Sequence, residues 1–246
     1  MTYNAEKFIP FTDRNETKSE HIKYMFDEIA PQYDRLNHLM SFGLDKVWRE
    51  KGLLKLKEFY PQTILDVATG TGDLAIKAFK LLKPKQILGI DISEGMMEIG
   101  KRKVAAEGLS EQIKFEWQDC SGLQLEPESF DAVMMAFGIR NFENTDKALQ
   151  NLLGVLRPGG KLMILELSTP EHFPMKQAYY LYSRFIIPTM GRIIAKNQDA
   201  YKYLPKSIAN FPQNKALKTI LEKNGFRLVQ YKKLFPGVCT LYLAIK

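Results

Sequence analysis

Two glycines of this sequence lie where a short apolar run gives way to a helical pattern. Gly70 and Gly72 follow the run at residues 63–69. Glycine lets the chain turn tightly and lets a ligand approach the backbone closely. The segment also satisfies the G-x-G-x-x-G/A pattern of dinucleotide-binding loops. That signal is weak alone, because such turns also serve plain strand-to-helix connections.

Aspartates end the next two runs of the same kind. Asp91 ends the run at 86–92, about 20 residues beyond Gly72, where a carboxylate can accept hydrogen bonds from ribose hydroxyls. Asp119 follows the run at 113–118 and could receive the amino group of an adenine. A helix cap is the structural alternative for Asp91. The three loops should lie side by side at one edge of a parallel sheet, so together they predict an adenosine site.

Acidic side chains at the glycine loop distinguish between adenosine cofactors. Asp66 and Asp73 flank the loop. Carboxylates at a helix start disfavour a pyrophosphate, whereas they suit a sulfonium cation and an amino group. The Tyr-x-x-x-Lys spacing of short-chain dehydrogenases occurs only at Tyr3–Lys7 and Tyr242–Lys246, in the tail and on the last β run. The sequence therefore favours S-adenosylmethionine over a nicotinamide dinucleotide.

Short β-rich runs alternate with helical patterns from residue 63 onward, which predicts a mostly parallel sheet with right-handed crossovers. Two last runs are joined at residues 235–237, a connection that permits only an antiparallel hairpin. This pattern resembles the α/β fold of class I S-adenosylmethionine-dependent methyltransferases, a Rossmann-like seven-stranded sheet whose last strand is antiparallel. The runs are 63–69, 86–92, 113–118, 130–137, 161–167, 226–234 and 238–245, and the helical patterns are 74–82, 95–106, 146–156 and 215–224.

The length of 246 residues fits a single methyltransferase domain, residues 1–246. Within it we expect a cofactor-binding core at 63–168 and a final helix and hairpin at 213–246. An N-terminal helical cap at 18–48 should lie across the carboxyl edge of the sheet. The insertion at 170–212 is rich in tyrosine and phenylalanine. Such a segment is commonly a packed cap, and caps at this edge also build substrate pockets.

Cysteine usage and charge narrow the location and the partners. Cys120 and Cys239 form neither a disulfide framework nor a metal-spaced cluster, so no metal is expected and a cytoplasmic location is predicted. The net charge of +7 suits nucleic acid, an anionic membrane surface, an acidic ligand or merely a soluble surface. The most apolar segment, residues 178–195, is interrupted by charges and by proline, so it is not expected to cross a bilayer.

Several stretches have a distinctive composition. The most specific is YDRLNHLMSFG at 33–43, followed by Trp48. Others are LRPGGKL at 156–162, running on to ELS at 166–168, FGIRN at 137–141, YKYL at 201–204 and SI at 207–208. Through these stretches the chain resembles a known family, the ubiquinone/menaquinone biosynthesis C-methyltransferases, over residues 20–246. The sequence departs from it at Leu36, Asp45 and Gly154, where the family usually has a methionine, a histidine and a basic residue.

The resemblance implies methyl transfer from S-adenosylmethionine to a ring carbon of a reduced prenylated quinone, in the first place demethylmenaquinol. A ubiquinone-pathway benzoquinol, another small molecule and RNA stay open as alternatives. The likeness matches Thr71, Asp91, Asp119 and Cys120 to cofactor contacts. Ala136 matches a further contact that is often a serine, so it can offer only its backbone. Asp66, Gly70 and Gly72 complete the predicted cofactor site.

The implied chemistry needs a polar group at the acceptor. A hydroquinol carbon becomes nucleophilic as its neighbouring hydroxyl ionises, and a phenol pKa of about 10 leaves little phenolate at neutral pH. Arg140 is expected to stabilise that phenolate or to hold a water that takes the proton, with a structural ion pair as its alternative role. Asp34, Asn37 and Tyr201 are expected to complete the catalytic pocket. His38 ranks below Arg140 as a candidate base.

Apolar residues lie beside cations in the 170–212 insertion. They fit peripheral contact with an anionic membrane at its inner face, and a core-packed helix with solvated lysines is the equal alternative. Nucleic acid is not expected, and the sequence leaves open whether the chain forms a homo-oligomer. The apolar residues are Phe185, Ile186, Ile187, Met190, Ile193 and Ile194, and the cations are Lys176, Arg184, Arg192 and Lys196.

Overall fold

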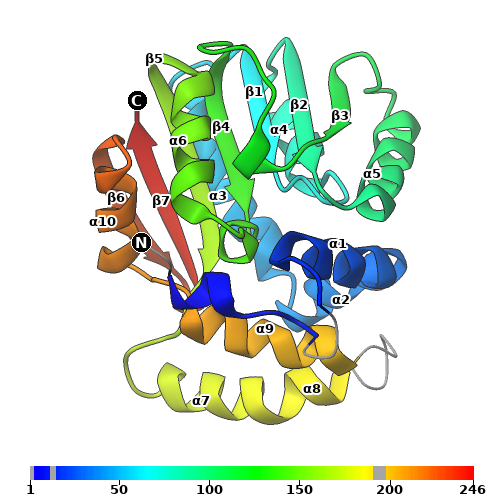
Figure 1. The fold of residues 1–246 in the computed structure, drawn as a ribbon, viewed down its shortest axis with the longest axis vertical. Helices are drawn as coiled ribbons and strands as arrows, with labels where there is room; N and C mark the ends of the chain where they lie inside the picture. Colours follow the sequence, from blue (N-terminus) through cyan, green and yellow to red (C-terminus); the bar gives the residue numbers. More distant parts are fainter. Residues whose placement is uncertain (1–2, 12–14, 191–197) are drawn as a thin grey trace.

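The computed structural model describes residues 3–11, 15–190 and 198–246. Its centre is a seven-stranded sheet in the order β3-β2-β1-β4-β5-β7-β6 (Figure 1). The first five strands run parallel, and β7 is antiparallel to both β5 and β6. The strands are β1 Thr63–Val67, β2 Gln86–Asp91, β3 Ile113–Trp117, β4 Phe130–Ala136, β5 Leu156–Leu167, β6 Arg227–Leu234 and β7 Cys239–Ile245.

Successive strand residues point to opposite faces of the sheet, and each face carries its own helices. Ile64, Met134 and Met163 pack with α3, α4 and α5 on one face. Leu65 and Val133 pack with α6 and α10 on the other. The helices are α3 Leu44–Lys57, α4 Asp73–Leu82, α5 Glu94–Ala106, α6 Thr145–Val155 and α10 Lys215–Lys223.

A third core forms below the carboxyl ends of the parallel strands, where α1, α2 and α9 meet (Figure 1). Ile22, Leu36 and Tyr201 are buried in it. The capping elements are α1 Lys18–Ile29, α2 Tyr33–Met40, α7 Met175–Leu181, η5 Tyr182–Ile186, α8 Ile187–Met190 and α9 Gln198–Asn210. Short single turns complete the chain: η1 Asn4–Lys7, η2 Ala30–Gln32, η3 Cys120–Gly122 and η4 Ile139–Asn141.

Two segments differ most from the sequence-based expectation. The helix expected at 146–156 ends at Val155, and the strand expected to begin at residue 161 begins at Leu156 and runs through the Pro-Gly-Gly turn, with a register shift against β4. The expected N-terminal cap at 18–48 ends inside α3. That helix packs Trp48 and Leu53 onto the sheet, so it belongs to the sheet's cover.

No helix in the described ranges combines the length and the apolar character needed to cross a membrane.

Candidate active site

A cleft opens where the loops after β1, β2, β3 and β4 meet, and we call it the cofactor cleft. Five predicted cofactor residues line it: Gly70, Asp91, Asp119, Cys120 and Ala136. Gly70 has a φ of +56°, and a Cβ added there would meet no atom within 4 Å, so its missing side chain leaves space at the cleft. The sheet edge thus gathers these residues at one place, as expected of a topological switch point.

Asp91 ties the glycine loop to the second strand. Its carboxylate accepts hydrogen bonds from the backbone N–H groups of Gly70 and Ser93, both at 2.8 Å. Burial raises the pKa of Asp91 above its ordinary value. Cys120 is buried as well, and burial raises the pKa of its thiol, so it offers the cleft a neutral side chain.

Three other predicted cofactor residues, Asp66, Thr71 and Gly72, do not line the cleft. Asp66 is buried and accepts a hydrogen bond from the Thr69 hydroxyl at 2.7 Å, and one of its carboxylate oxygens has no hydrogen-bond partner among the described residues. Burial raises its pKa to about 7. A Cβ on Gly72 would lie 2.9 Å from the Phe115 ring, so that glycine allows close packing. These residues support the loop from behind.

Helix α1 covers the cofactor cleft, and its lining residues were not among the site residues predicted from the sequence. Ser19, Ile22 and Phe26 line the cleft from this helix. The Ser19 hydroxyl donates to Asp119 at 3.0 Å. At the other end of the helix, Asp27 accepts hydrogen bonds from the Ser93 hydroxyl at 2.6 Å and from the Gly95 N–H at 2.9 Å. These contacts join residues far apart in the sequence, so only the fold brings them together.

Next to the cleft lies a larger space of about 370 Å³, which we call the apolar cavity. Three predicted catalytic residues line it: Asn37, Arg140 and Tyr201. The other lining residues are mostly apolar or aromatic, and they come from α1–α3, the turn after β4, α7–α9 and the β6–β7 connection. They include Met25, Met40, Trp48, Leu167, Met175, Tyr179, Tyr203, Ile208 and Val238.

Arg140 is a buried cation held on two sides. Its Nη1 donates to Glu166 Oε1 at 2.8 Å and to the carbonyl of Phe137. Burial lowers the pKa of Arg140, but the charge of Glu166 outweighs that effect and raises it overall. Lys18 donates to the carbonyls of Arg140 and Phe142 at 3.2 and 3.0 Å, and burial lowers its pKa to about 8. The guanidinium is therefore fixed and charged beside the cavity.

The cofactor cleft and the apolar cavity share three lining residues: Phe26, Tyr33 and Phe137. Tyr33 is hydrogen-bonded to Asn37, and burial raises the pKa of its hydroxyl. A group in the cleft and a ring in the cavity would therefore meet at these side chains. Tyr33 was not predicted as a site residue, although it opens the most specific of the family-like stretches.

Asp34, the fourth predicted catalytic residue, is not among the lining residues of the cavity. Its carboxylate accepts from the Thr71 hydroxyl at 2.5 Å and from Lys103 at 2.9 Å. Lys103 in turn pairs with Asp73. Asp34 thus joins α2 to the glycine loop and to α5, outside the cavity.

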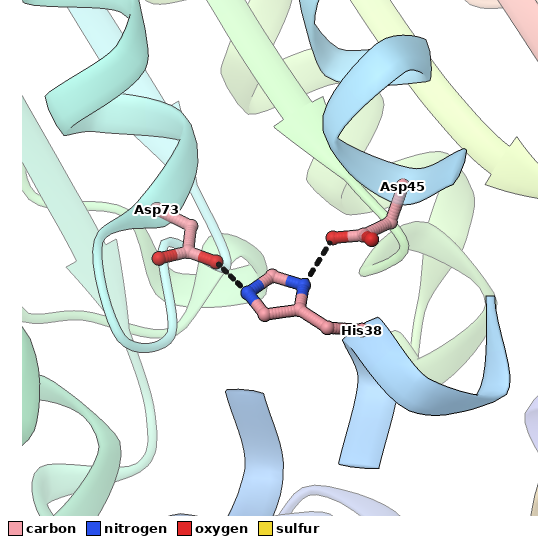
Figure 2. Close-up of side chains that lie close together, drawn as sticks. All are labelled: His38, Asp45 and Asp73. Atoms are coloured by element: carbon pink, nitrogen blue, oxygen red, sulfur yellow. Dashed lines mark hydrogen bonds and ion pairs between the residues drawn. The ribbon is translucent and has the colours of Figure 1, made fainter. Parts of the chain in front are cut away.

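His38 lies between Asp45 and Asp73 (Figure 2). Its Nδ1 is 2.8 Å from Asp45 Oδ2, and its Nε2 is 3.6 Å from Asp73 Oδ2. One imidazole and two carboxylates at this spacing could hold a metal ion. Arg49 already pairs with Asp45, and Lys103 with Asp73, which works against a second cation. The expectation of no metal stays a prediction.

Comparisons with known proteins give the relationships of the chain. The ubiE/COQ5 methyltransferase family matches residues 13–246. The chain is 51% identical over 246 residues, all of both chains, to a demethylmenaquinone methyltransferase of Bacteroides fragilis. It is 46% identical over 99% of both chains to one of Porphyromonas gingivalis. The chain also resembles a ubiquinone/menaquinone biosynthesis C-methyltransferase of Geotalea daltonii, at 40% identity over 93% of this chain and 97% of the other.

Solved structures share the fold at low identity. A SAM-dependent methyltransferase of Aquifex aeolicus aligns with a TM-score of 0.56 at 20% identity, over 78% of this chain and 88% of that one. The [4+2]-cyclase SpnF aligns with a TM-score of 0.64 at 16% identity, over 93% and 96%. A cyclase and a methyltransferase on one fold show that architecture alone does not settle the reaction. The full-length sequence match does more, and it confirms the predicted relationship, fold class and enzyme type. This chain belongs to the ubiE/COQ5 methyltransferase family.

Proposed function

We propose that the protein transfers a methyl group from S-adenosylmethionine to a ring carbon of a reduced prenylated quinone, demethylmenaquinol in the first place. One observation carries the proposal: the cofactor cleft at the strand ends adjoins the apolar cavity through Phe26, Tyr33 and Phe137. The names of the relatives at 51% and 46% identity support the menaquinone branch. A benzoquinol of the ubiquinone branch is the second candidate, because the relative at 40% identity is named for both.

The residues of the cofactor cleft fit S-adenosylmethionine, as the sequence predicts. Asp91 ends β2, and its carboxylate already accepts hydrogen bonds from two backbone N–H groups. It can also accept hydrogen bonds from the ribose hydroxyls of the cofactor. Ser19 and Asp119 offer polar atoms at the position expected for the adenine. Gly70 leaves space for close approach of the ligand. When bound, this cofactor supplies an electrophilic methyl group.

The residues of the apolar cavity fit the acceptor. The fixed cation of Arg140 can stabilise the negative charge that develops on a hydroquinol oxygen, and in a water-poor cavity that effect is large. Arg140 stays charged, so it is not the base. Burial raises the pKa of the hydroxyls of Tyr33 and Tyr201, so both stay protonated at neutral pH and can donate hydrogen bonds. The apolar walls suit a ring with a hydrocarbon tail.

The proposal is tested by one assay with methyl-labelled S-adenosylmethionine. Reduced demethylmenaquinone and a reduced ubiquinone precursor are offered side by side, to the wild type and to Arg140→Gln. We expect label in the naphthoquinol, with less or none in the benzoquinol, and a large loss in the variant. Absence of label from both quinols, or label in bulk RNA instead, overturns the proposal.

We also propose that α7 and η5 contact an anionic membrane, from which an acceptor with an apolar tail would enter. Leu181 and Phe185 are 55% and 57% exposed, and Tyr180 and Ile186 are exposed beside them. The cations Lys176 and Arg184 are also exposed. Apolar side chains among cations favour binding to anionic lipids. A cytoplasmic protein would meet such lipids at the inner face of the membrane.

Part of the predicted membrane segment needs correction. Ile187 is 4% exposed, because it packs in the third core with Met25 and Tyr203, so it does not face outward. Arg192, Ile193, Ile194 and Lys196 lie outside the described residues.

Co-sedimentation with vesicles tests the membrane contact. We expect binding to vesicles that contain phosphatidylglycerol and weaker binding to neutral phosphatidylcholine vesicles. The double variant Leu181→Ser with Phe185→Ser should lose binding, while Phe59→Ser, an exposed aromatic on another surface, should retain it. Equal binding by the double variant and the wild type refutes the contact.

A further inference from the structure

A second arginine lines the apolar cavity, and the chemistry described above does not use it. Arg49 comes from α3 and is 8% exposed. Its Nη1 pairs with Asp45, and its guanidinium lies over the Phe137 ring, 5.4 Å from the ring centroid. Its Nε is buried and has no hydrogen-bond partner among the described residues. A buried N–H of a cation without an acceptor is costly, so the group is suited to a ligand oxygen.

The two arginines share one neighbourhood. The Arg49 guanidinium lies over the Phe137 ring, and the backbone carbonyl of Phe137 accepts a hydrogen bond from Arg140. Tyr33 lines the same cavity, and the charges of both arginines lower the pKa of its hydroxyl against the larger effect of burial. The Nε of Arg140 is also buried and without a partner among the described residues. One apolar cavity is therefore lined by two buried arginines, each paired with a carboxylate and each with an N–H that has no acceptor among the described residues.

The two arginines differ in their position relative to the cofactor cleft. Gly138 and Asn141, which flank Arg140 in the chain, line the cleft. Asp45 and Trp48, which precede Arg49 in α3, line only the cavity. Arg140 is thus the cation on the side of the methyl donor, and Arg49 is the cation farther from it.

We infer that Arg49 binds the second oxygen of a para-dioxygenated ring, across the ring from the hydroxyl that Arg140 serves. The inference rests on the proposed function and deepens it, because it makes the hydroquinol, rather than a simple phenol, the preferred substrate class. Two fixed cations on opposite oxygens would also hold the ring in one orientation, with its reacting carbon toward the cleft.

Asp45 and His38 are positioning residues for this contact. Asp45 is 3% exposed, pairs with Arg49 and accepts from the Ser41 hydroxyl at 2.7 Å. The Nδ1 atom of His38 contacts the same carboxylate, and its Nε2 atom faces Asp73 (Figure 2). This chain of polar contacts, in which Asp45 itself lines the cavity, holds the Arg49 guanidinium in place.

The test compares two acceptors in a steady-state methyl-transfer assay. One is a prenylated 1,4-naphthohydroquinone. The other is a 3-prenyl-1-naphthol, which keeps the hydroxyl beside the reacting carbon and lacks the oxygen across the ring.

For Arg49→Gln we expect the KM for the hydroquinone to rise about tenfold or more, as for the loss of one charged hydrogen bond. We expect kcat/KM for the naphthol to change less than about threefold. Lys51→Gln, an exposed cation on the same helix, is the matched control and should change neither.

Arg49→Lys guards against a variant that does not fold, because it keeps a cation beside Asp45. It should show a smaller loss that is again confined to the hydroquinone. Equal losses with both acceptors would show that Arg49 only supports the fold, and no loss with either would show that it does not touch the ligand. Both results overturn the inference while the proposed function stands. A wild type that methylates neither acceptor overturns the proposed function itself.

Discussion

The cofactor cleft and the apolar cavity adjoin at three aromatic side chains, yet they are built in different ways. The cleft is formed by loops that follow consecutive parallel strands, and hydrogen bonds such as Asp91 to Gly70 join those loops directly. The cavity is enclosed by side chains from segments far apart in the chain, among them Trp48, Tyr201 and Val238. Backbone topology thus fixes the first region, and packing of the capping helices fixes the second.

The difference predicts that single changes affect one ligand and spare the other. A cleft residue should alter the binding of S-adenosylmethionine or of its demethylated product. A cavity residue should alter turnover or the KM of the quinol. A change that weakened both ligands equally would break this separation, except at the shared residues Phe26, Tyr33 and Phe137.

The largest effect is expected at Arg140. Arg140→Gln should lower kcat by about 100- to 1000-fold, as for the removal of one preorganised charge-stabilising donor. The dissociation constant of S-adenosylhomocysteine, measured by calorimetry, should stay within about threefold. The single variant leaves Glu166 buried and unpaired, which is destabilising. The double variant Arg140→Gln with Glu166→Gln removes both charges and should show the same low kcat. Normal turnover by the double variant would show that the Arg140–Glu166 pair only supports the fold.

Asp91 should show the complementary effect. Asp91→Asn replaces a carboxylate that can bind ribose hydroxyls, so the dissociation constant of S-adenosylhomocysteine should rise about 10- to 100-fold. The KM for the quinol, measured at saturating cofactor, should be nearly unchanged. Glu94→Gln, which removes an exposed carboxylate from the next helix, serves as the control. Unchanged affinity of Asp91→Asn for S-adenosylhomocysteine would show that the cofactor does not bind in the cleft.

The buried carboxyl of Asp66, behind the cleft, can be tested by measuring the free energy of unfolding at two pH values. Its pKa in the folded protein, about 7, lies above that of an exposed aspartate, so the folded state binds the proton more tightly than the unfolded state. Its contribution to stability is complete in acid and is lost as pH rises through about 7. Asp66→Asn should therefore raise the free energy of unfolding at about pH 8 by about 1–3 kcal/mol and change it little at about pH 3, below the pKa of an exposed aspartate.

Urea unfolding at both pH values measures this effect. Asp131 supplies a control of opposite sign: it is partly buried, yet hydrogen bonds from Thr63 and Arg157 hold its pKa below the ordinary value. Asp131→Asn should lower stability at the higher pH. If Asp66→Asn were less stable than the wild type at about pH 8, the Asp66 carboxylate would be a stabilising charge, contrary to this account.

The smallest effect is expected at Tyr201. Tyr201 lines the cavity, and burial raises the pKa of its hydroxyl. The hydroxyl can therefore donate one hydrogen bond, but it cannot act as a base. Tyr201→Phe should lower kcat/KM for the quinol by less than about tenfold, the size of one neutral hydrogen bond. The alkaline limb of the pH–rate profile should not move. A shifted alkaline limb would make Tyr201 a titrating catalytic group.

The two regions also differ in how far the sequence predicted them. Gly70, Asp91 and Asp119 were predictable because a strand's carboxyl end fixes where the next residues lie. Asp34 and Asn37 were predicted together from one helix, but only Asn37 lines the cavity. The rotation of α2 is set by tertiary packing, in which Leu36 is fully buried and Asp34 turns to Lys103.

Arg49 had no local signal, because it is one of many basic residues on helical patterns. Its importance depends on burial beside Phe137, and that burial comes from α3 packing against the sheet. The same holds for Ser19, whose contact with Asp119 spans the chain from α1 to the third strand's loop. Contacts that join distant segments follow from the whole fold and not from spacing.

A crystal structure with S-adenosylhomocysteine and a reduced demethylmenaquinone analogue tests the two-region account most directly. We expect the ribose to bind at Asp91 and the quinol ring to lie in the apolar cavity. The ring should have one oxygen at Arg140 and its edge toward Phe26, Tyr33 and Phe137. A quinol ring bound outside this cavity, or a nucleoside away from the ends of the parallel strands, would contradict it.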